Sequence, residues 1–396
     1  MTKNDDKRVP VLRFKGFNDD WAQRKLKDLT DVRDGTHSSP KYVEAGHPFI
    51  TSKNINNGSI DYRDIKYITD EDFDEINKRS KVDIHDILMG MIGTVGNLAL
   101  IDKKPNFAIK NIALIKDIGK IDYLFLYNFL QSNYVSKELI QKLDGGTQKF
   151  ISLNKVRDLN ISVASFQEQK AISKCLMRVN NLLILQQRKL QQLKLLKKAM
   201  LQDLFTDKNV PKLRFNGFDA NWIQCKLEKE ALLTMGQSPS GSTYSDQPST
   251  YILVQGNADL KNGWVKPRIW TTQITKLAKK GDIIITVRAP AGKVGRTNFD
   301  VVLGRGVASI QGNDFIFYLL SKMDMNKYWK KYAAGSTFES INSNDIKNTR
   351  VHVPNLLEQN RIANLFLRLD DLIRFQQNKL NNLQKTKQFL FQNMFI

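Results

Sequence analysis

Two long stretches of this 396-residue chain carry the same heptad spacing of apolar residues, and this pattern limits the fold more than any other feature. From Ile172 to Leu204 the spaced positions recur at alternating steps of four and three residues. The same series runs from Ile362 to Met394, 190 residues later. Such spacing predicts a coiled-coil helix. Neither stretch contains Gly or Pro, so each is expected to form one helix of about 39 residues, roughly 58 Å long.

A single helix of this kind would leave an apolar stripe in water, so we expect the two helices to pair with each other in antiparallel register. The expected partners are Ile172 with Leu390, Val179 with Leu383, Gln186 with Gln376, Leu193 with Leu369, and Met200 with Ile362. A buried glutamine pair would fix the register. Lys197 and Lys387 share another core position. We expect their ammonium groups to reach out of the seam, the line of heptad positions along which the two helices meet. The alternative is that each helix packs on its own domain.

A second repeat lies ahead of each globular stretch. Residues 9–26 read VPVLRFKGFNDDWAQRKL and residues 210–227 read VPKLRFNGFDANWIQCKL, with 11 of 18 positions identical. We call these two stretches the lead-in segments. The chain therefore has two halves with matching ends and different middles, and repeated units usually repeat a task.

These patterns divide the chain into six parts. They are an N-terminal segment (1–17), a first globular domain (18–166), a first helix (167–205), a linker (206–218), a second globular domain (219–356) and a second helix (357–396). Within the globular domains we expect helices over 123–143 and 315–332, and strands over 159–163 and 349–353 that lead into the long helices. The predicted fold class is α+β, with two mixed recognition domains in inverted orientation, separated by two long antiparallel helices related by a pseudo-two-fold repeat.

The net charge is +21, with 61 Lys and Arg against 40 Asp and Glu. A charge this high on a two-domain protein indicates a polyanionic partner, with nucleic acid first in line. The two cysteines, Cys175 and Cys225, provide no disulfide framework or thiolate metal site. With no apolar leader and no apolar run long enough to span a bilayer, the chain is expected to be cytoplasmic.

Catalytic signatures do not stand out. We find no phosphate-binding loop that ends in Lys-Ser/Thr, no Gly-x-Ser-x-Gly turn, and no Asn/Asp-Pro-Pro-aromatic motif of an amino-methyltransferase. The four histidines lack metal-ligand spacing. Gly90, Gly93 and Gly96 are expected to mark bulges and turns rather than a dinucleotide site.

Polar loops with DNA-reading residue types occupy parallel places in both halves. The candidate DNA contacts are Thr36, His37, Ser38, Lys41, Tyr42, Lys53, Asn54, Thr147, Gln148 and Lys149 in the first half, and Gln237, Ser238, Gln255, Asn257, Arg288, Arg305, Ser336 and Thr337 in the second. Arg, Lys, Asn and Gln pair well with base edges, while Ser, Thr and Lys suit phosphates. The alternative for each single residue is an ordinary solvated loop.

With these motifs in place, the whole chain resembles the specificity (S) subunit of type I restriction–modification enzymes. The resemblance is carried by VPxLRFxGF and a Trp at the start of both halves, DGTHSSPKY (34–42), GQSP (236–239), GDIIITVRAPAG (281–292) and GRGVA (304–308). Long heptad helices that open with Glu-Gln complete it. The resemblance extends from end to end.

The resemblance implies two target-recognition domains that each read one half of a bipartite double-stranded DNA site. It implies that two modification (M) subunits, which carry S-adenosylmethionine, dock on the helices and methylate adenine N6. Restriction (R) subunits, which use ATP and Mg, would join them. The chain itself is expected to hold no cofactor or metal and to catalyse nothing. Because the two middles differ, we expect an asymmetric target whose half-sites lie about one DNA turn, ~34 Å, apart.

Two other functions stay open at this stage. A stand-alone DNA-modifying enzyme would transfer methyl groups from S-adenosylmethionine to DNA without an M subunit. A coiled-coil scaffold without sequence preference would bind all DNA sequences equally at a fixed salt concentration, because phosphate contacts alone carry no sequence information.

Overall fold

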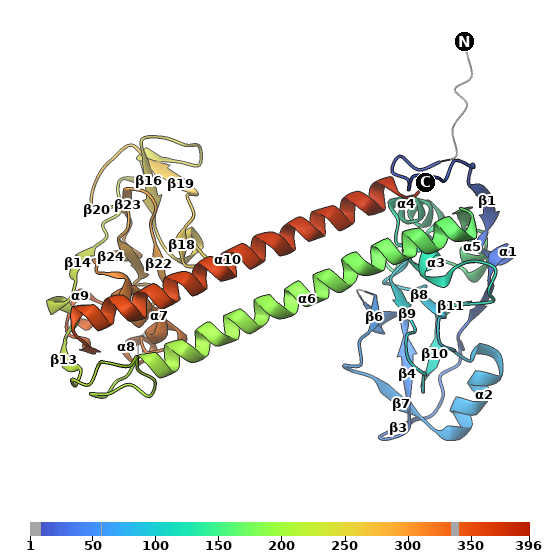
Figure 1. Ribbon diagram of the computed structural model, residues 1–396, viewed down its shortest axis with the longest axis horizontal. Helices are drawn as coiled ribbons and strands as arrows, with labels where there is room; N and C mark the ends of the chain where they lie inside the picture. Colours follow the sequence, from blue (N-terminus) through green and yellow to red (C-terminus); the bar gives the residue numbers. More distant parts are fainter. Residues whose placement is uncertain (1–8, 57, 334–339) are drawn as a thin grey trace, which may run out of the picture. The chain divides into compact units, whose positions relative to one another are not determined.

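The computed structural model describes residues 9–56, 58–333 and 340–396, which belong to two compact units. Unit 1 holds the chain up to Gln187 together with 379–396, and unit 2 holds 188–378. Two long helices, α6 (Phe166–Leu204) and α10 (Leu356–Asn393), each begin in one unit and end in the other (Figure 1). The predicted pair of uninterrupted heptad helices is therefore confirmed.

Unit 1 is built on two four-stranded sheets. The first has the order β10 (Ala108–Lys110), β4 (His47–Thr51), β7 (Lys66–Ile68) and β3 (Tyr42–Val43), and the second has the order β2 (Asp31–Asp34), β11 (Ile112–Lys116), β8 (Ile87–Gly90) and β9 (Leu98–Leu100). Two smaller ladders join β1 (Ala22–Lys25) to β12 (Asn160–Val163) and β5 (Ile55–Asn56) to β6 (Ser59–Ile60). The helices are α1 (Leu26–Leu29), α2 (Asp70–Ser80), α3 (Tyr123–Leu130), α4 (Asn133–Lys142) and α5 (Leu153–Arg157). The strand pairs are antiparallel except for β10 and β4, which run parallel.

Unit 2 repeats this plan with larger sheets. The six-stranded sheet has the order β14 (Leu232–Met235), β24 (Val307–Gln311), β21 (Ile283–Thr286), β22 (Val294–Arg296), β18 (Trp264–Val265) and β17 (Leu260–Lys261). The five-stranded sheet has the order β15 (Tyr244–Ser245), β19 (Ile269–Thr271), β16 (Tyr251–Val254), β23 (Val301–Leu303) and β20 (Leu277–Ala278). A ladder joins β13 (Ile223–Lys226) to β25 (Arg350–Val353), and the helices are α7 (Asp314–Met325), α8 (Lys330–Ala333) and α9 (Ser343–Lys347).

Matching aromatic residues stand at the centre of the two cores. Trp21 meets Phe125 edge-on, with ring centroids 5.6 Å apart, and Trp222 meets Phe315 with the same separation and interplanar angle. All four side chains are almost fully buried. Aromatic pairs prefer such edge-to-face geometry. The tryptophans of the two lead-in segments therefore fill the same place in each unit.

A buried carboxylate ties each lead-in segment to the start of a long helix. In unit 1, Glu168 of α6 accepts two hydrogen bonds from Arg13 (2.7 and 2.8 Å) and one from Trp21 Nε1 (3.2 Å). The Glu168 hydrogen bond raises the pKa of Arg13. Carboxylate–arginine pairs of this bidentate kind fix orientation as well as adding energy.

Unit 2 contains the same clamp. Glu358 of α10 accepts two bonds from Arg214 (both 2.8 Å) and one from Trp222 Nε1 (3.3 Å). Because the two arginines and two tryptophans are identities of the lead-in repeat, their conservation within the chain has a direct structural cause.

The heptad positions form the covered face of both long helices. Each spaced position from Ile172 to Leu204 and from Ile362 to Met394 is buried or half-buried, whereas most of the remaining positions are exposed. In unit 1 the last turns of α10 pack with the first turns of α6, so that Leu390 joins the core that holds Ile172. In unit 2 Met200 packs on the core that holds Ile362. The segments of the two helices are thus antiparallel within each unit, as predicted.

Two shorter predictions need correction. The helix expected over 123–143 is two helices, because Ser132 caps a new one by accepting a hydrogen bond from Val135 N. The helix expected over 315–332 ends at Met325, since Lys327 adopts a positive φ of 56° that a helix cannot continue through. The predicted strands before the long helices are confirmed as β12 and β25. Gly93 and Gly96 have positive φ in the β8–β9 connection, as turn glycines do.

Candidate nucleic-acid interface

The 34–42 loop of unit 1 is fastened to the turn between β10 and β11. Thr36 N donates to Ile109 O (3.0 Å), and Gly35 leaves no room for a side chain against the Ile109 backbone. His37 bonds Asp34 through Nε2 (2.8 Å) and Asn111 through Nδ1 (2.9 Å). The glycine of the DGTH motif is therefore required by close packing, and the histidine links the loop to the turn.

Ser52 connects this turn to two further loops. Its hydroxyl donates to Asn111 O (2.6 Å) and accepts from Met91 N (3.1 Å), and its carbonyl accepts from Thr94 (2.7 Å). The 90–94 segment in turn receives the 145–150 loop, since Gly93 N donates to Lys149 O (2.9 Å). The three loops that the sequence singled out in the first half are thus linked through one small set of contacts.

The structure places the first-half candidates in two groups. The exposed ones are His37, Ser38, Lys41, Tyr42, Lys53, Thr147, Gln148 and Lys149, while Thr36 is half-buried. Asn54 is only 4% exposed, and its Oδ1 accepts from Thr51 N (3.0 Å) and Thr51 Oγ1 (2.8 Å). Its side chain closes a turn and also lines the cavity described next, so its contact with DNA stays a prediction.

A cavity of about 280 Å³ opens among these loops and contains residues that the sequence analysis missed. Besides Tyr42 and Lys53 it is lined by Lys66, Lys110 and Asn111. Lys66 lies on β7 and its ammonium group sits 4.1 Å from the centre of the Tyr42 ring. Lys110 directly follows the apolar run at 107–109, and Arg305 follows the run at 301–303 after one glycine, so a cation just beyond an apolar run was a signal in the sequence.

The loops of unit 2 are fastened by equivalent backbone bonds. Gly236 N donates to Val307 O (3.0 Å) as Gly35 N donates to Ile112 O (3.0 Å). Gln237 N donates to Leu303 O (2.9 Å) in the way that Thr36 N reaches Ile109 O. These matches make Gln237 the counterpart of Thr36, and they place Arg305 in the turn that Asn111 occupies in unit 1.

Arg288 has an equally definite counterpart. Ile341 N donates to Val287 O (2.9 Å), which matches the bond from Ile151 N to Met91 O (2.9 Å). Arg288 therefore corresponds to Ile92, and each forms a β-bridge to the residue before that donor. The hairpin is stiffened by Thr286, whose hydroxyl donates to Pro290 O (2.7 Å) and accepts from Lys293 N (2.9 Å).

The second-half candidates are also distributed unevenly. Gln237, Asn257, Arg288 and Arg305 are exposed, whereas Ser238 and Gln255 are half-buried. Ser238 Oγ accepts from Arg305 N (3.1 Å), so it supports the turn that carries the arginine. Ser336 and Thr337 lie outside the described residues.

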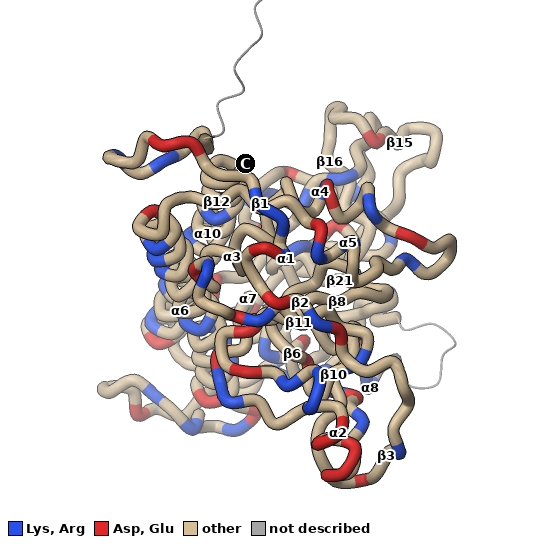
Figure 2. The backbone as a smooth tube through the Cα atoms, turned by 90° about the vertical axis from the view of Figure 1, so that its right-hand side faces the viewer, with Lys and Arg blue, Asp and Glu red and all other residues tan. Residues whose placement is uncertain are grey.

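Among the residues that the structure describes, the basic candidates face solvent without acidic partners. Within the described ranges, none of Lys41, Lys53, Lys149, Arg288 and Arg305 forms an ion pair, although many other lysines and arginines of the chain do. Elsewhere the charges segregate by element, with Lys and Arg along α6 and Asp and Glu on α2 (Figure 2). Unpaired cations on loops are suited to a polyanion.

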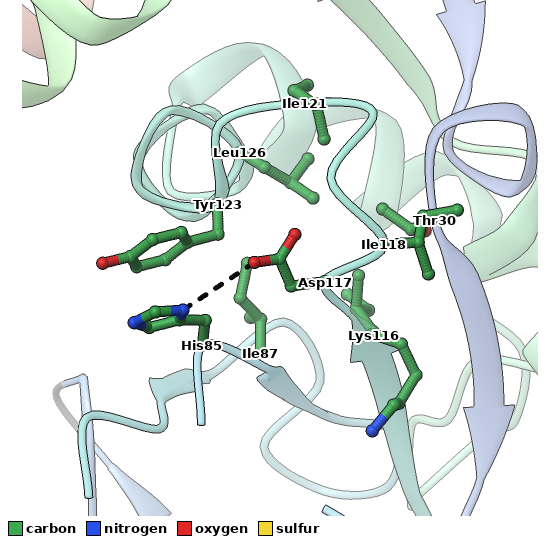
Figure 3. Close-up of a pocket in the computed structure, with 10 residues that line it drawn as sticks. Thr30, His85, Ile87, Lys116, Asp117, Ile118, Ile121, Tyr123 and Leu126 are labelled. Carbon is green, nitrogen blue, oxygen red and sulfur yellow. Dashed lines mark ion pairs between the residues drawn. The ribbon is translucent and has the colours of Figure 1, made fainter. Parts of the chain in front are cut away.

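A second, much smaller cavity of about 10 Å³ lies beneath α3 (Figure 3). His85 stacks on Tyr123 with ring centroids 4.0 Å apart, and its Nδ1 lies 3.8 Å from Asp117 Oδ2. Such a space holds about one water molecule. It is a packing feature of unit 1.

Two kinds of feature are absent from the described ranges, a membrane-spanning helix and a cluster of metal ligands. No helix there is apolar enough over a sufficient length to cross a membrane. No group of three or more His, Cys, Asp or Glu residues there is placed to hold a metal ion.

Comparison with known proteins identifies the family. The sequence model for the type I restriction modification DNA specificity domain matches residues 18–195 and again 234–385. The putative type I restriction enzyme MjaX specificity subunit of Methanocaldococcus jannaschii is 29% identical over 396 residues, which cover 93% of this chain and 91% of that protein. The EcoBI specificity subunit of Escherichia coli is 25% identical over 188 residues, covering 41% of this chain and 40% of its own length.

Solved structures support the fold. A chain from a study of complex assembly and conformational transition of the type I R-M system aligns with a TM-score of 0.62 at 21% identity, covering 96% of this chain and 98% of its own. The type I S subunit from M. genitalium aligns with a TM-score of 0.62 at 14% identity, covering 98% and 99%.

The chain belongs to the type I restriction–modification DNA specificity family. It is a DNA-recognition subunit rather than an enzyme, and type I specificity subunits act together with modification and restriction subunits on DNA.

Proposed function

We propose that the two loop clusters read two different halves of one bipartite DNA site. The observation that carries this proposal is the match between the units in backbone contacts combined with their difference in the side chains at matching places. Thr36 and Asn111 in unit 1 stand where Gln237 and Arg305 stand in unit 2. Side chains of different hydrogen-bonding type at equivalent places select different bases. The target should therefore be asymmetric.

Mapping modified adenines in the DNA of cells that carry this chain and its modification subunit tests the proposal. We expect methyl groups on adenine N6 within a two-part sequence whose halves differ, one on each strand. Sites that share a single uninterrupted sequence, or two identical halves, would contradict the proposal. The cells' cytoplasm, where such DNA lies, is the compartment in which we propose that the subunit works.

We further propose that two copies of one modification subunit dock on the long helices. Leu182 and Leu185 of α6 are 45% and 58% exposed, and Leu372 and Phe375, 190 residues later, are 51% and 68% exposed. Two large apolar side chains one helical turn apart are thus open at matching positions of both halves. A repeated apolar surface supports binding of the same partner twice. S-adenosylmethionine would be held by these partners, and ATP and Mg by restriction subunits that join them.

Substitution at one copy of this surface tests the stoichiometry. Native mass spectrometry of the complex with Leu185→Asp or Phe375→Asp should show one modification subunit instead of two, and the double variant should bind none. Ile184→Asp is a matched control, because Ile184 is 61% exposed while its counterpart, Arg374, is not apolar. Loss of both partners from a single variant would contradict two independent sites.

The length of the long helices is proposed to set the distance between the DNA half-sites. Both helices are continuous, and their seam positions are covered throughout. One extra heptad after Gln186, with a matching heptad after Gln376, adds about 10 Å of helix, or about three base pairs of DNA. The mapped spacer should lengthen by that amount, and an unchanged spacer would rule out this role.

A further inference from the structure

The cavity of unit 1 is lined by residues of strands β3, β4 and β7 and of the end of β10. These four strands form one sheet (Figure 1). Three lysines line it, Lys53, Lys66 and Lys110, together with a single carboxylate, Asp64. Within the described part of the chain none of the three ammonium groups forms an ion pair. Lys110 instead donates to Ser39 Oγ (2.7 Å), and Lys66 lies over the Tyr42 ring. With three ammonium groups and one carboxylate, the lining of the cavity carries a net positive charge.

Two of the three lysines, Lys66 and Lys110, stand on strands of the sheet, whereas Lys53 lies in the short 3-10 helix after β4. Strand pairing sets Lys66 opposite Phe49, and it sets Lys110 beside Thr51 in the parallel ladder of β10 and β4. The Tyr42 ring packs at a tilt on Phe49, with centroids 6.3 Å apart. Side chains fixed by strands form a more rigid site than side chains on loops. Clustering cations without acidic partners is costly unless an anion binds there.

Unit 2 does not repeat this cluster. Its β16–β19 pair sets Ile269 opposite Leu253, in the place of Lys66 opposite Phe49. Its β16–β23 ladder pairs Val254 with Leu303 as the first pairs Ile50 with Ile109, so Gly304 stands in the place of Lys110. Two of the three lysines thus have uncharged counterparts. The cluster is a property of the first recognition domain and does not come from the shared scaffold.

We infer that this cavity is a binding site for a phosphate of the DNA backbone, which positions the first half-site. The inference rests on the proposed function and deepens it. Lysine is a point-charge donor that suits phosphate oxygens and carries little base information. The Tyr42 ring, against which Lys66 lies, and the Asn111 side chain line the cavity beside the ammonium groups. The cavity is next to the 34–42 loop, so a phosphate held in it sets the register in which that loop meets the bases.

The experiment measures DNA affinity against salt concentration for the full-length chain assembled with its modification subunits. The probes are a duplex with the mapped target and a duplex with the same composition in scrambled order. For Lys66→Met with Lys110→Met, which removes the contact with one phosphate, the slope of log affinity against log salt should fall by about one. Affinity for both duplexes should fall by the same factor. Lys66→Arg should keep the wild-type slope.

The matched control is Lys103→Met with Lys104→Met. These two lysines belong to the same unit, are exposed, and do not line the cavity. The control removes the same charge but leaves the cavity intact. The slope of log affinity against log salt for the control should therefore stay close to that of the wild type. An equal decrease of the slope in both double variants would mean that only the net charge of the protein matters, and it would overturn the inference. A selective loss of preference at one base pair would make the cavity a base-reading site and also overturn it.

A second measurement needs no variant of the protein. Replacing single phosphates of the target by neutral methylphosphonates should weaken wild-type binding at one or two positions of one half-site, and those positions should become insensitive in the Lys66→Met, Lys110→Met protein. Uniform sensitivity in both proteins would contradict the site. If the wild type binds the target and the scrambled duplex equally well, the proposed function itself fails. That result can be told apart from a failure of the phosphate site, which leaves the wild-type preference for the target unchanged.

Discussion

The two recognition units share their backbone contacts and differ in where they carry positive charge. In unit 1 two lysines, Lys66 and Lys110, stand on strands at the wall of a cavity. In unit 2 the same places hold Ile269 and Gly304, and the exposed arginines Arg288 and Arg305 stand outside the strands. The difference teaches that the scaffold fixes which positions face a ligand, while the residue at each position is free to change. One scaffold can thus carry two specificities.

The largest loss of stability is expected at the buried glutamates of the two clamps, which both units share. Glu168→Gln and Glu358→Gln each leave a mostly buried arginine without its carboxylate, which should lower the free energy of unfolding by about 3 kcal/mol in either case. Urea unfolding of each variant measures this. The exposed pair of Arg374 and Asp371 supplies the control, because Asp371→Asn should cost well under 1 kcal/mol. Clearly unequal losses from the two glutamates would break the equivalence of the clamps.

The second prediction concerns the arginines that only unit 2 carries. Arg288→Ala or Arg305→Ala should weaken recognition of one half-site by about 1–3 kcal/mol per contacted base pair and leave the other unchanged. Competition binding with duplexes mutated in one half at a time separates the two. Arg288→Ile is the sharper variant, since it installs the unit 1 residue at that place. Equal losses on both halves would mean that these arginines act through folding.

A smaller effect is expected at a polar contact beside the helix seam. Lys197 pairs with Asp370, which also accepts a hydrogen bond from Tyr318 (2.8 Å). Burial, reinforced by Asp370, raises the pKa of the Tyr318 hydroxyl, so it remains a donor. At the matching place in α6 the chain has Asn180 instead of an aspartate. Asp370→Asn should lower the free energy of unfolding by about 1 kcal/mol. If the free energy of unfolding of Asp370→Asn equals that of the wild type, the aspartate at this place adds no more stability than Asn180 does at the matching place in α6.

Lys387, the counterpart of Lys197, should make the free energy of unfolding depend on pH. Burial lowers the pKa of Lys387 below its usual value. Between that lowered pKa and the unfolded value the unfolded chain binds more protons, so stability rises with pH in this window. Lys387→Met should therefore be more stable than the wild type at neutral pH, and the advantage should vanish toward about pH 10.5. An advantage that stays constant across this range of pH would contradict the assignment.

The sequence predicted the seam well and the interface only in part. The heptad pattern identified which face of each helix is covered, because that face depends on local spacing alone. Lys197 was expected to lift its ammonium group out of the seam, and only the structure shows that it meets the carboxylate of Asp370 there. The sequence did not show that the candidate Asn54 is nearly buried and closes a turn, because that depends on how Thr51 and Asp61 are brought to it.

The sequence by itself determined the frame of this protein: two continuous amphipathic helices, two lead-in segments with a shared Arg and Trp, and a strongly basic charge. Those features follow from periodicity, identity and counting, which need no knowledge of distant contacts. The tertiary structure alone decided which cations gather. Lys66 and Lys110 are 44 residues apart in sequence and meet only because β7 and β10 both pair with β4. Strand pairing over such separations is set by the packing of the whole domain, and it is there that each unit acquires its own recognition surface.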